Sequence, residues 1–134
     1  MLLNFRRAVP GFLLVLTLLL AGCQSSEEKA EAYYQSGLEL LEKGDEDRAL
    51  VEFRNVFKYN GFHKEARKAY ADTLLKRGEV AEAYSQYLRL IEQYPDTLDV
   101  RATLAEMSFD AGRWDELERH GEAAIKLAPD EPRV

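Results

Sequence analysis

Apolar side chains recur at intervals of three and four residues along most of this chain, between stretches of charged residues. Ala49, Phe53, Val56 and Phe57, for example, form one apolar stripe that is flanked by charged side chains. This periodicity is that of an amphipathic α-helix rather than of a β-strand. The pattern returns in pairs of short segments and therefore predicts an all-α protein.

The same features return along the chain at one fixed interval, the spacing that separates Gly44 from Gly78 and Gly78 from Gly112. A period of about 34 residues is the sequence signature of a helical repeat, in which each unit is a pair of antiparallel helices. The positions that keep the interval are the small residues Gly37, Ala71 and Ala105, the glycines Gly44, Gly78 and Gly112, then Ala49, Ala83 and Leu117, and finally the aromatic residues Phe53 and Tyr87.

Each repeated position has a physical role in a helical hairpin. The glycines follow the first helix of each unit and suit the left-handed conformation that ends a helix. Asp45 then suits the start of the second helix. The small residues let the two helices approach closely, with Ala49 and Ala83 expected opposite them, and the aromatic residues fill the wider space beyond. Pro95 and Pro129 are expected to stop the second helix of their units.

This arrangement resembles the tetratricopeptide repeat, a helix–turn–helix unit of about 34 residues. The resemblance implies an all-α solenoid of three repeats, with about six antiparallel helices in a segment of a right-handed superhelix. The match is weaker in the third repeat, where Leu117 replaces the expected alanine and Gly121 the expected aromatic residue. Because these two positions lie one helical turn apart, we expect the larger and the smaller side chain to conserve the packed volume. The predicted units are 30–63, 64–97 and 98–131, and 132–134 would begin a further repeat.

A short apolar segment precedes the repeats. Arg6 and Arg7 give the chain a basic start, and residues 12–20 are almost all apolar. This segment is shorter than the roughly 20 apolar residues of a membrane-spanning helix. We therefore interpret residues 1–22 as a signal peptide, expected to form a helix ahead of the repeats. An anchor helix, an ordinary secretory signal and, on the two arginines, a twin-arginine signal are the alternatives.

Cys23, the single cysteine of the chain, follows this segment directly. One cysteine excludes a disulfide within the chain and metal or redox sites built on paired thiols. Together with Ala21 and Gly22 it resembles the lipobox of bacterial lipoprotein precursors, which implies acylation of the Cys23 thiol, cleavage before Cys23 and acylation of the new amino group. Residues 23–29 would then be a lipidated cysteine and a short polar tether. In such lipoproteins an aspartate directly after the lipidated cysteine would favour the inner membrane. Gln24 stands at that position, so we expect the outer membrane, with the repeats facing the periplasm.

The charge and the scarcity of reactive side chains exclude several classes of function. The formal charge is −6, and it becomes −8 when the signal peptide, which holds Arg6, Arg7 and no acid, is removed. Such a chain, without a cluster of Lys and Arg, is a poor candidate for nucleic-acid binding. His63 and His120 are too few and too poorly placed for a metal site, and no nucleotide-binding or nucleophile motif is present. We expect no catalytic residue, no metal and no cofactor.

A protein-binding groove is the expected functional site. In tetratricopeptide arrays the first helix of each unit lines a concave face. The resemblance implies that the first helices of this chain line such a face, with a strip of apolar residues beside acidic ones. Such a strip suits an extended or helical protein segment with apolar anchors and some basic residues, although the leucines could instead pack between hairpins. The chaperone-tail carboxylate clamp is disfavoured because Tyr34 and Leu38 occupy two positions that it requires as Lys and Asn. The predicted groove residues are Tyr34, Leu38, Leu41, Glu42, Lys68, Asp72, Leu75, Glu106, Phe109 and Asp110.

The end of the third repeat carries a further expectation. Ala124, Ile125 and Leu127 would lie on an apolar edge, which solenoids cover with a capping element. We expect further repeats or a partner chain there. Two functional classes remain open: a scaffold for an envelope machine (outer-membrane protein assembly, pilus or secretion apparatus, or exopolysaccharide export), and a helical accessory domain of a longer envelope enzyme.

Overall fold

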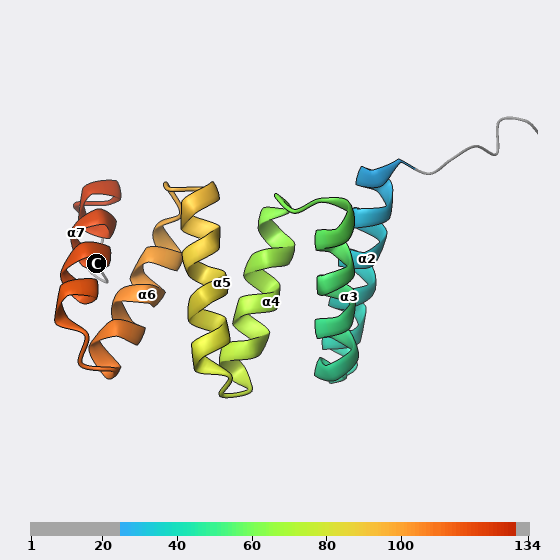
Figure 1. Ribbon diagram of the computed structural model, residues 1–134, viewed down its shortest axis with the longest axis horizontal. Coiled ribbons are helices and arrows are strands. Elements are labelled where there is room, and N and C mark those ends of the chain that lie inside the picture. Colours follow the sequence, from blue (N-terminus) through green and yellow to red (C-terminus); the bar gives the residue numbers. More distant parts are fainter. Residues whose placement is uncertain (1–24, 131–134) are drawn as a thin grey trace, which may run out of the picture.

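The computed structural model describes residues 25–130, within which six α-helices and no strand are present (Figure 1). The predicted signal peptide, Cys23 and the start of a further repeat at 132–134 lie outside the described residues. The helices are α2 (Ser26–Glu42), α3 (Glu46–Tyr59), α4 (Lys64–Lys76), α5 (Val80–Gln93), α6 (Leu98–Asp110) and α7 (Trp114–Leu127).

The helices pair into three hairpins that stand side by side in one row, from α2–α3 through α4–α5 to α6–α7 (Figure 1). Each helix packs mainly against the helices directly before and after it in the chain. Contacts of this kind define a solenoid, in which every repeat touches only its neighbours. The predicted all-α solenoid of three helical hairpins is confirmed.

The tight turn inside each hairpin has the same construction in all three units. The backbone φ angles of Gly44, Gly78 and Gly112 are 75°, 80° and 65°. Residues that have a Cβ atom rarely adopt such positive φ angles. In the first turn the amide of Gly44 donates to the carbonyl of Leu41, and the next amide donates to the carbonyl one residue earlier, both at 2.9 Å. This pair of bonds is the Schellman motif. It recurs in the other two turns, so the predicted role of the three glycines is confirmed.

The starts of α2, α3 and α4 are each fixed by a side chain that accepts a backbone hydrogen bond. Asp45 accepts from the amide of Arg48 at the start of α3, as predicted. At the start of α2, the Ser25 hydroxyl accepts from the amide of Glu28 while the Glu28 carboxylate accepts from the amide of Ser25. This reciprocal capping box begins the helix at Ser26. Residues 26–29, expected within the tether, are therefore the first turn of α2.

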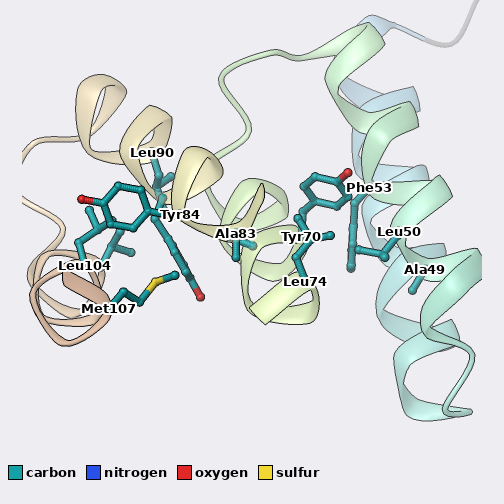
Figure 2. Packing of buried hydrophobic residues seen from close by; sticks show 13 residues of the cluster. Ala49, Leu50, Phe53, Tyr70, Leu74, Ala83, Tyr84, Leu90, Leu104 and Met107 are labelled. Atoms are coloured by element: carbon teal, nitrogen blue, oxygen red, sulfur yellow. The ribbon is translucent and has the colours of Figure 1, made fainter. Parts of the chain in front are cut away.

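One buried cluster runs through the stack and joins the hairpins (Figure 2). Its members come from α3, α4, α5 and α6, and no buried side chain of α7 belongs to it. Phe53 is fully buried and Tyr87 is nearly so. Both aromatic residues of the repeat pattern thus fill the space between the helices of their hairpins, as predicted.

The closest approach within the first hairpin differs from the expectation. A Cβ atom added to Gly37 would lie 2.4 Å from Cε1 of Phe53. The Phe53 ring, and not Ala49, therefore occupies the space directly in front of Gly37. The small residue is required here because the aromatic ring is pressed against the backbone of the opposite helix.

The third hairpin is packed less completely than the other two. Helix α7 buries only His120 and Ala124, whereas α3 and α5 each bury four side chains. On the exposed edge, Ile125 and Leu127 remain accessible as expected. The sequence places Ala124 on this edge as well, but it points into the hairpin and is buried. The edge is therefore narrower than the sequence suggests.

Candidate binding surface

The residues predicted to line a groove all lie on the first helices of the three hairpins, α2, α4 and α6. Half of them are exposed: Glu42, Asp72, Glu106, Phe109 and Asp110. The other half are partly buried: Tyr34, Leu38, Leu41, Lys68 and Leu75. The partly buried apolar members pack against the core cluster. Each leucine therefore helps to join the helices, and only part of its side chain is available to a partner.

Tyr34 lies at the junction of the first two hairpins. Its ring centroid is 4.8 Å from that of His63, the residue that caps α4 by accepting from the amide of Ala66. His63 also contacts the Glu31 carboxylate at 3.2 Å. Partial burial is the largest cause that raises the pKa of the Tyr34 hydroxyl, and the nearby carboxylates of Glu65 and Glu31 raise it further. Tyr34 is thus held as a neutral, amphipathic group at the edge of the surface.

Two of the predicted residues on α4 are engaged with each other. Lys68 Nζ lies 2.9 Å from Asp72 Oδ2 and 3.3 Å from Asp99 on α6. The Tyr87 hydroxyl donates to the other oxygen of Asp72 at 2.6 Å. Burial by itself lowers the pKa of Lys68, but the two carboxylates outweigh it and raise the pKa. This network ties α4, α5 and α6 together, so a ligand would have to compete for Lys68 and Asp72.

The most accessible large apolar side chain on α2, α4 and α6 is Phe109, which forms an aromatic pair with Trp114 of α7. Phe109 on α6 is 59% exposed, and Trp114 at the start of α7 is 63% exposed. Their rings meet edge to face with centroids 5.9 Å apart. Exposed aromatic side chains of this size are the groups that most often dominate protein interfaces.

A hollow of about 420 Å³ opens between α6 and α7 beside this pair. We call it the α6–α7 hollow. Its walls are Ala102, Ala105, Phe109, Leu117, Gly121 and Ala124, and Glu106 and Asp110 complete its lining. The expectation that Leu117 compensates for the small residue at Gly121 is therefore wrong. Leu117 is only half-buried, and its side chain leaves open the volume that an aromatic ring takes in the other hairpins.

Sequence reasoning did not find Trp114 or the hollow as parts of the surface. The apolar periodicity includes Trp114 in a helix, but it falls at the first residue of α7, where it lies outside the packed stripe. The departure from the repeat pattern at Gly121 was the available signal for the hollow. Among residues 25–130, no group of three or more histidine, cysteine or acidic residues is arranged to hold a metal ion. In the same range, no helix is both long enough and apolar enough to cross a membrane.

The second histidine belongs to a buried polar cluster where α5, α6 and α7 meet. The Tyr84 hydroxyl donates to Glu116 at 2.9 Å and lies 3.4 Å from His120 Nε2. His120 is almost fully buried, and its Nδ1 atom has no hydrogen-bond partner. Burial is the largest cause that lowers the pKa of His120, and the positive charges of Arg119 and Arg101 lower it further. The carboxylate of Glu116 opposes this shift. The ring is therefore held neutral.

This lowered pKa predicts a loss of stability in acid. Above the ordinary histidine pKa of 6.5, His120 is neutral in both the folded and the unfolded chain. Below that pH the unfolded chain binds a proton at His120 before the folded chain does. The free energy of unfolding therefore falls as the pH falls. Thermal melts of wild type and His120→Gln between about pH 7.5 and about pH 5 measure this effect. The carboxylates titrate in both proteins, so the wild type should lose more stability than the variant. Equal losses would contradict the assignment.

This chain is a helical-repeat protein. It is built from three hairpins with the same turn, and the first helix of each hairpin carries exposed side chains that a binding partner could contact. The sequence profile of the tetratricopeptide repeat family matches residues 40–107, and the chain belongs to this family. An uncharacterised protein of Methanocaldococcus jannaschii is 41% identical over 56 residues, a match that covers 40% of this chain and 65% of the relative.

Solved structures of the same fold include known peptide binders. The first TPR domain of Spaghetti, bound to an HSP90 peptide, superposes with a TM-score of 0.70 at 14% identity, over 84% of this chain and 89% of that one. YrrB, described as a TPR protein with an unusual peptide-binding site, gives 0.66 at 23% identity, over 86% of this chain and 57% of that one. The TPR domain of Arabidopsis OM64 gives 0.69 at 14% identity, over 81% and 90% of the two chains. At these identities the likeness shows the fold alone.

Proposed function

We propose that this chain is a membrane-anchored scaffold of the bacterial cell envelope, which holds a protein or peptide segment on the first helices of its three repeats. The proposal that the chain binds a protein segment rests on the surface of α2, α4 and α6. A row of apolar side chains, the last of which is the exposed Phe109, lies there beside exposed acidic residues. Two solved relatives, the Spaghetti domain and YrrB, are described as peptide-binding. Membership of the same family supports a similar use of this chain.

The location is proposed from the sequence alone. The basic start, the short apolar segment and the lipobox-like residues before Cys23 support acylation and anchoring in the envelope. Gln24 supports the outer membrane. Because the capping box begins the first helix at Ser26, only Gln24 and Ser25 would separate the lipid from the repeats. The binding surface would therefore lie close to the membrane, where it could serve assembly, secretion, pilus or exopolysaccharide-export machinery.

One experiment with two independent arms tests this proposal. The full chain is expressed with an affinity tag, labelled with a palmitate analogue, and recovered from solubilised envelope together with its partners. Cys23→Ser should abolish the label, and a Cys23→Ser protein that still labels would contradict the anchor. A Tyr34→Ala/Phe109→Ala variant should keep the label but lose the partners that wild type recovers.

The matched control for this second arm is Phe62→Ala. Phe62 is a similarly exposed aromatic side chain, 68% accessible, but it lies in the turn between the first two hairpins. This variant should recover the same partners as wild type. Recovery of those partners by the Tyr34→Ala/Phe109→Ala protein would show that the first helices are not the binding surface.

A further inference from the structure

The α6–α7 hollow lies at a position where the other two hairpins hold an aromatic ring. Phe53, Tyr87 and Gly121 occupy the same position in successive repeats. Phe53 is fully buried between the helices of its hairpin, and Tyr87 is 2% exposed. At Gly121, by contrast, an added Cβ atom would meet no other atom within 4 Å. The third hairpin thus has two helices and a glycine turn like its neighbours but lacks their aromatic side chain.

The hollow is large enough to receive such a ring from outside, and the walls between its two helices are apolar. Its volume is about 420 Å³ and it is open to solvent; an enclosed apolar cavity of about 150 Å³ already holds benzene, so the size of the hollow admits a ring. Alanines and Leu117 form most of its walls. No buried side chain of α7 belongs to the core cluster, and within the described residues the space in front of Gly121 is open.

The charges at the rim restrict the chemistry of an occupant. Glu106 and Asp110 are both exposed and complete the lining, which contains no lysine or arginine. A segment that places a positive charge next to its ring would therefore be favoured at this rim. The edge-to-face pair of Phe109 and Trp114 adds exposed aromatic surface beside the opening.

We propose that the α6–α7 hollow is a docking site for one aromatic side chain, the size of Phe or Tyr, of a partner segment that carries lysine or arginine beside that residue. The partner completes the third hairpin by supplying the ring that Gly121 lacks. This inference rests on the proposed binding function and specifies which point of the surface holds the anchor. The hollow lies between the two helices of a repeat, and so it differs from a groove lined by the first helices alone.

Fluorescently labelled model peptides test the proposal in titrations followed by fluorescence anisotropy. The first has a central phenylalanine between lysines, the second replaces the phenylalanine by alanine, and the third replaces the lysines by glutamates. The full-length chain should bind the first at least about tenfold more tightly than either of the others, since burying a ring and pairing its neighbours each contribute to affinity. Equal binding of the first two peptides would overturn the proposal.

Substitutions at Gly121 locate the site. Gly121→Phe supplies the missing ring from within and should weaken the first peptide by at least about tenfold. Gly121→Ala adds only a Cβ atom in open space and is the matched control, with affinity expected to stay within about twofold of wild type. Circular dichroism verifies that both variants fold. If Gly121→Phe does not fold, Ala105→Leu fills the hollow from the α6 wall and should weaken binding in the same way.

The remaining outcomes separate this inference from the proposed function. If Tyr34→Ala weakens the first peptide and Gly121→Phe does not, the first-helix surface binds peptides and the hollow does not. A wild-type dimer that dissociates in the Gly121→Phe variant would show that a second copy occupies the hollow. Either result, like the absence of binding by the first peptide, would overturn the proposal.

Discussion

Phe53→Ala should lower the free energy of unfolding by about 3–5 kcal/mol, the largest loss expected from a single substitution in this chain. The Phe53 ring is fully buried and belongs to the cluster that joins the hairpins (Figure 2). It faces Gly37, which has no side chain that could move into the vacated space. The cavity would therefore remain largely open, which places the loss toward the upper end of the range.

Urea unfolding followed by circular dichroism measures this loss. Phe62→Ala is the matched control, because it removes the same side chain from an exposed position and should change stability by less than about 0.5 kcal/mol. The prediction requires a large difference between these two variants. Similar unfolding midpoints for both would mean that Phe53 is not the core residue described above.

Gly37→Ala and Gly121→Ala should change stability in opposite directions, although both replace a helical glycine by alanine. In a helix interior this replacement normally stabilises by about 1 kcal/mol. Gly121→Ala should show that gain, because the new Cβ atom meets nothing within 4 Å. Gly37→Ala should instead destabilise by about 1–3 kcal/mol, because its Cβ atom would lie 2.4 Å from Cε1 of the fully buried Phe53 ring.

A double mutant tests the physical reason for this difference. Phe53→Leu shortens the side chain that Gly37→Ala would strike, so the cost of Gly37→Ala should be smaller in the Phe53→Leu background than in wild type. The coupling is obtained from the unfolding free energies of the four proteins. If Gly37→Ala costs the same in both backgrounds, the contact with Phe53 is not what requires glycine.

The fold was predictable because its signals are local and repeated. Gly44, Gly78 and Gly112 mark the turns, and each requires glycine for a positive φ that the sequence position alone indicates. Pro95 and Pro129 come shortly after the last residues of α5 and α7. The turns depend on neighbours along the chain, so a single sequence with a fixed period was sufficient to place them, whereas the start of α2 at Ser26 falls before the predicted first unit.

The details of the surface were not predictable in the same way, because they depend on contacts between distant residues. The sequence placed Ala49 opposite Gly37, but which side chain fills that gap depends on the crossing of two helices. Lys68 was predicted as a groove residue, yet it is held by Asp72 and by Asp99 of the following hairpin. The hollow at Gly121 arises because a half-buried leucine one turn away leaves the aromatic position empty.

The central claim is that a partner protein is held on the first helices of the repeats, and site-specific photo-cross-linking in bacterial cells tests it most directly. A photoreactive residue is introduced at exposed positions of α2 and α6, Glu42 and Glu106, and at exposed control positions of α3 and α5, Lys58 and Glu92. We predict the same cross-linked partner at Glu42 and Glu106, and none at Lys58 and Glu92. Adducts at the control positions, with none at Glu42 or Glu106, would contradict the claim.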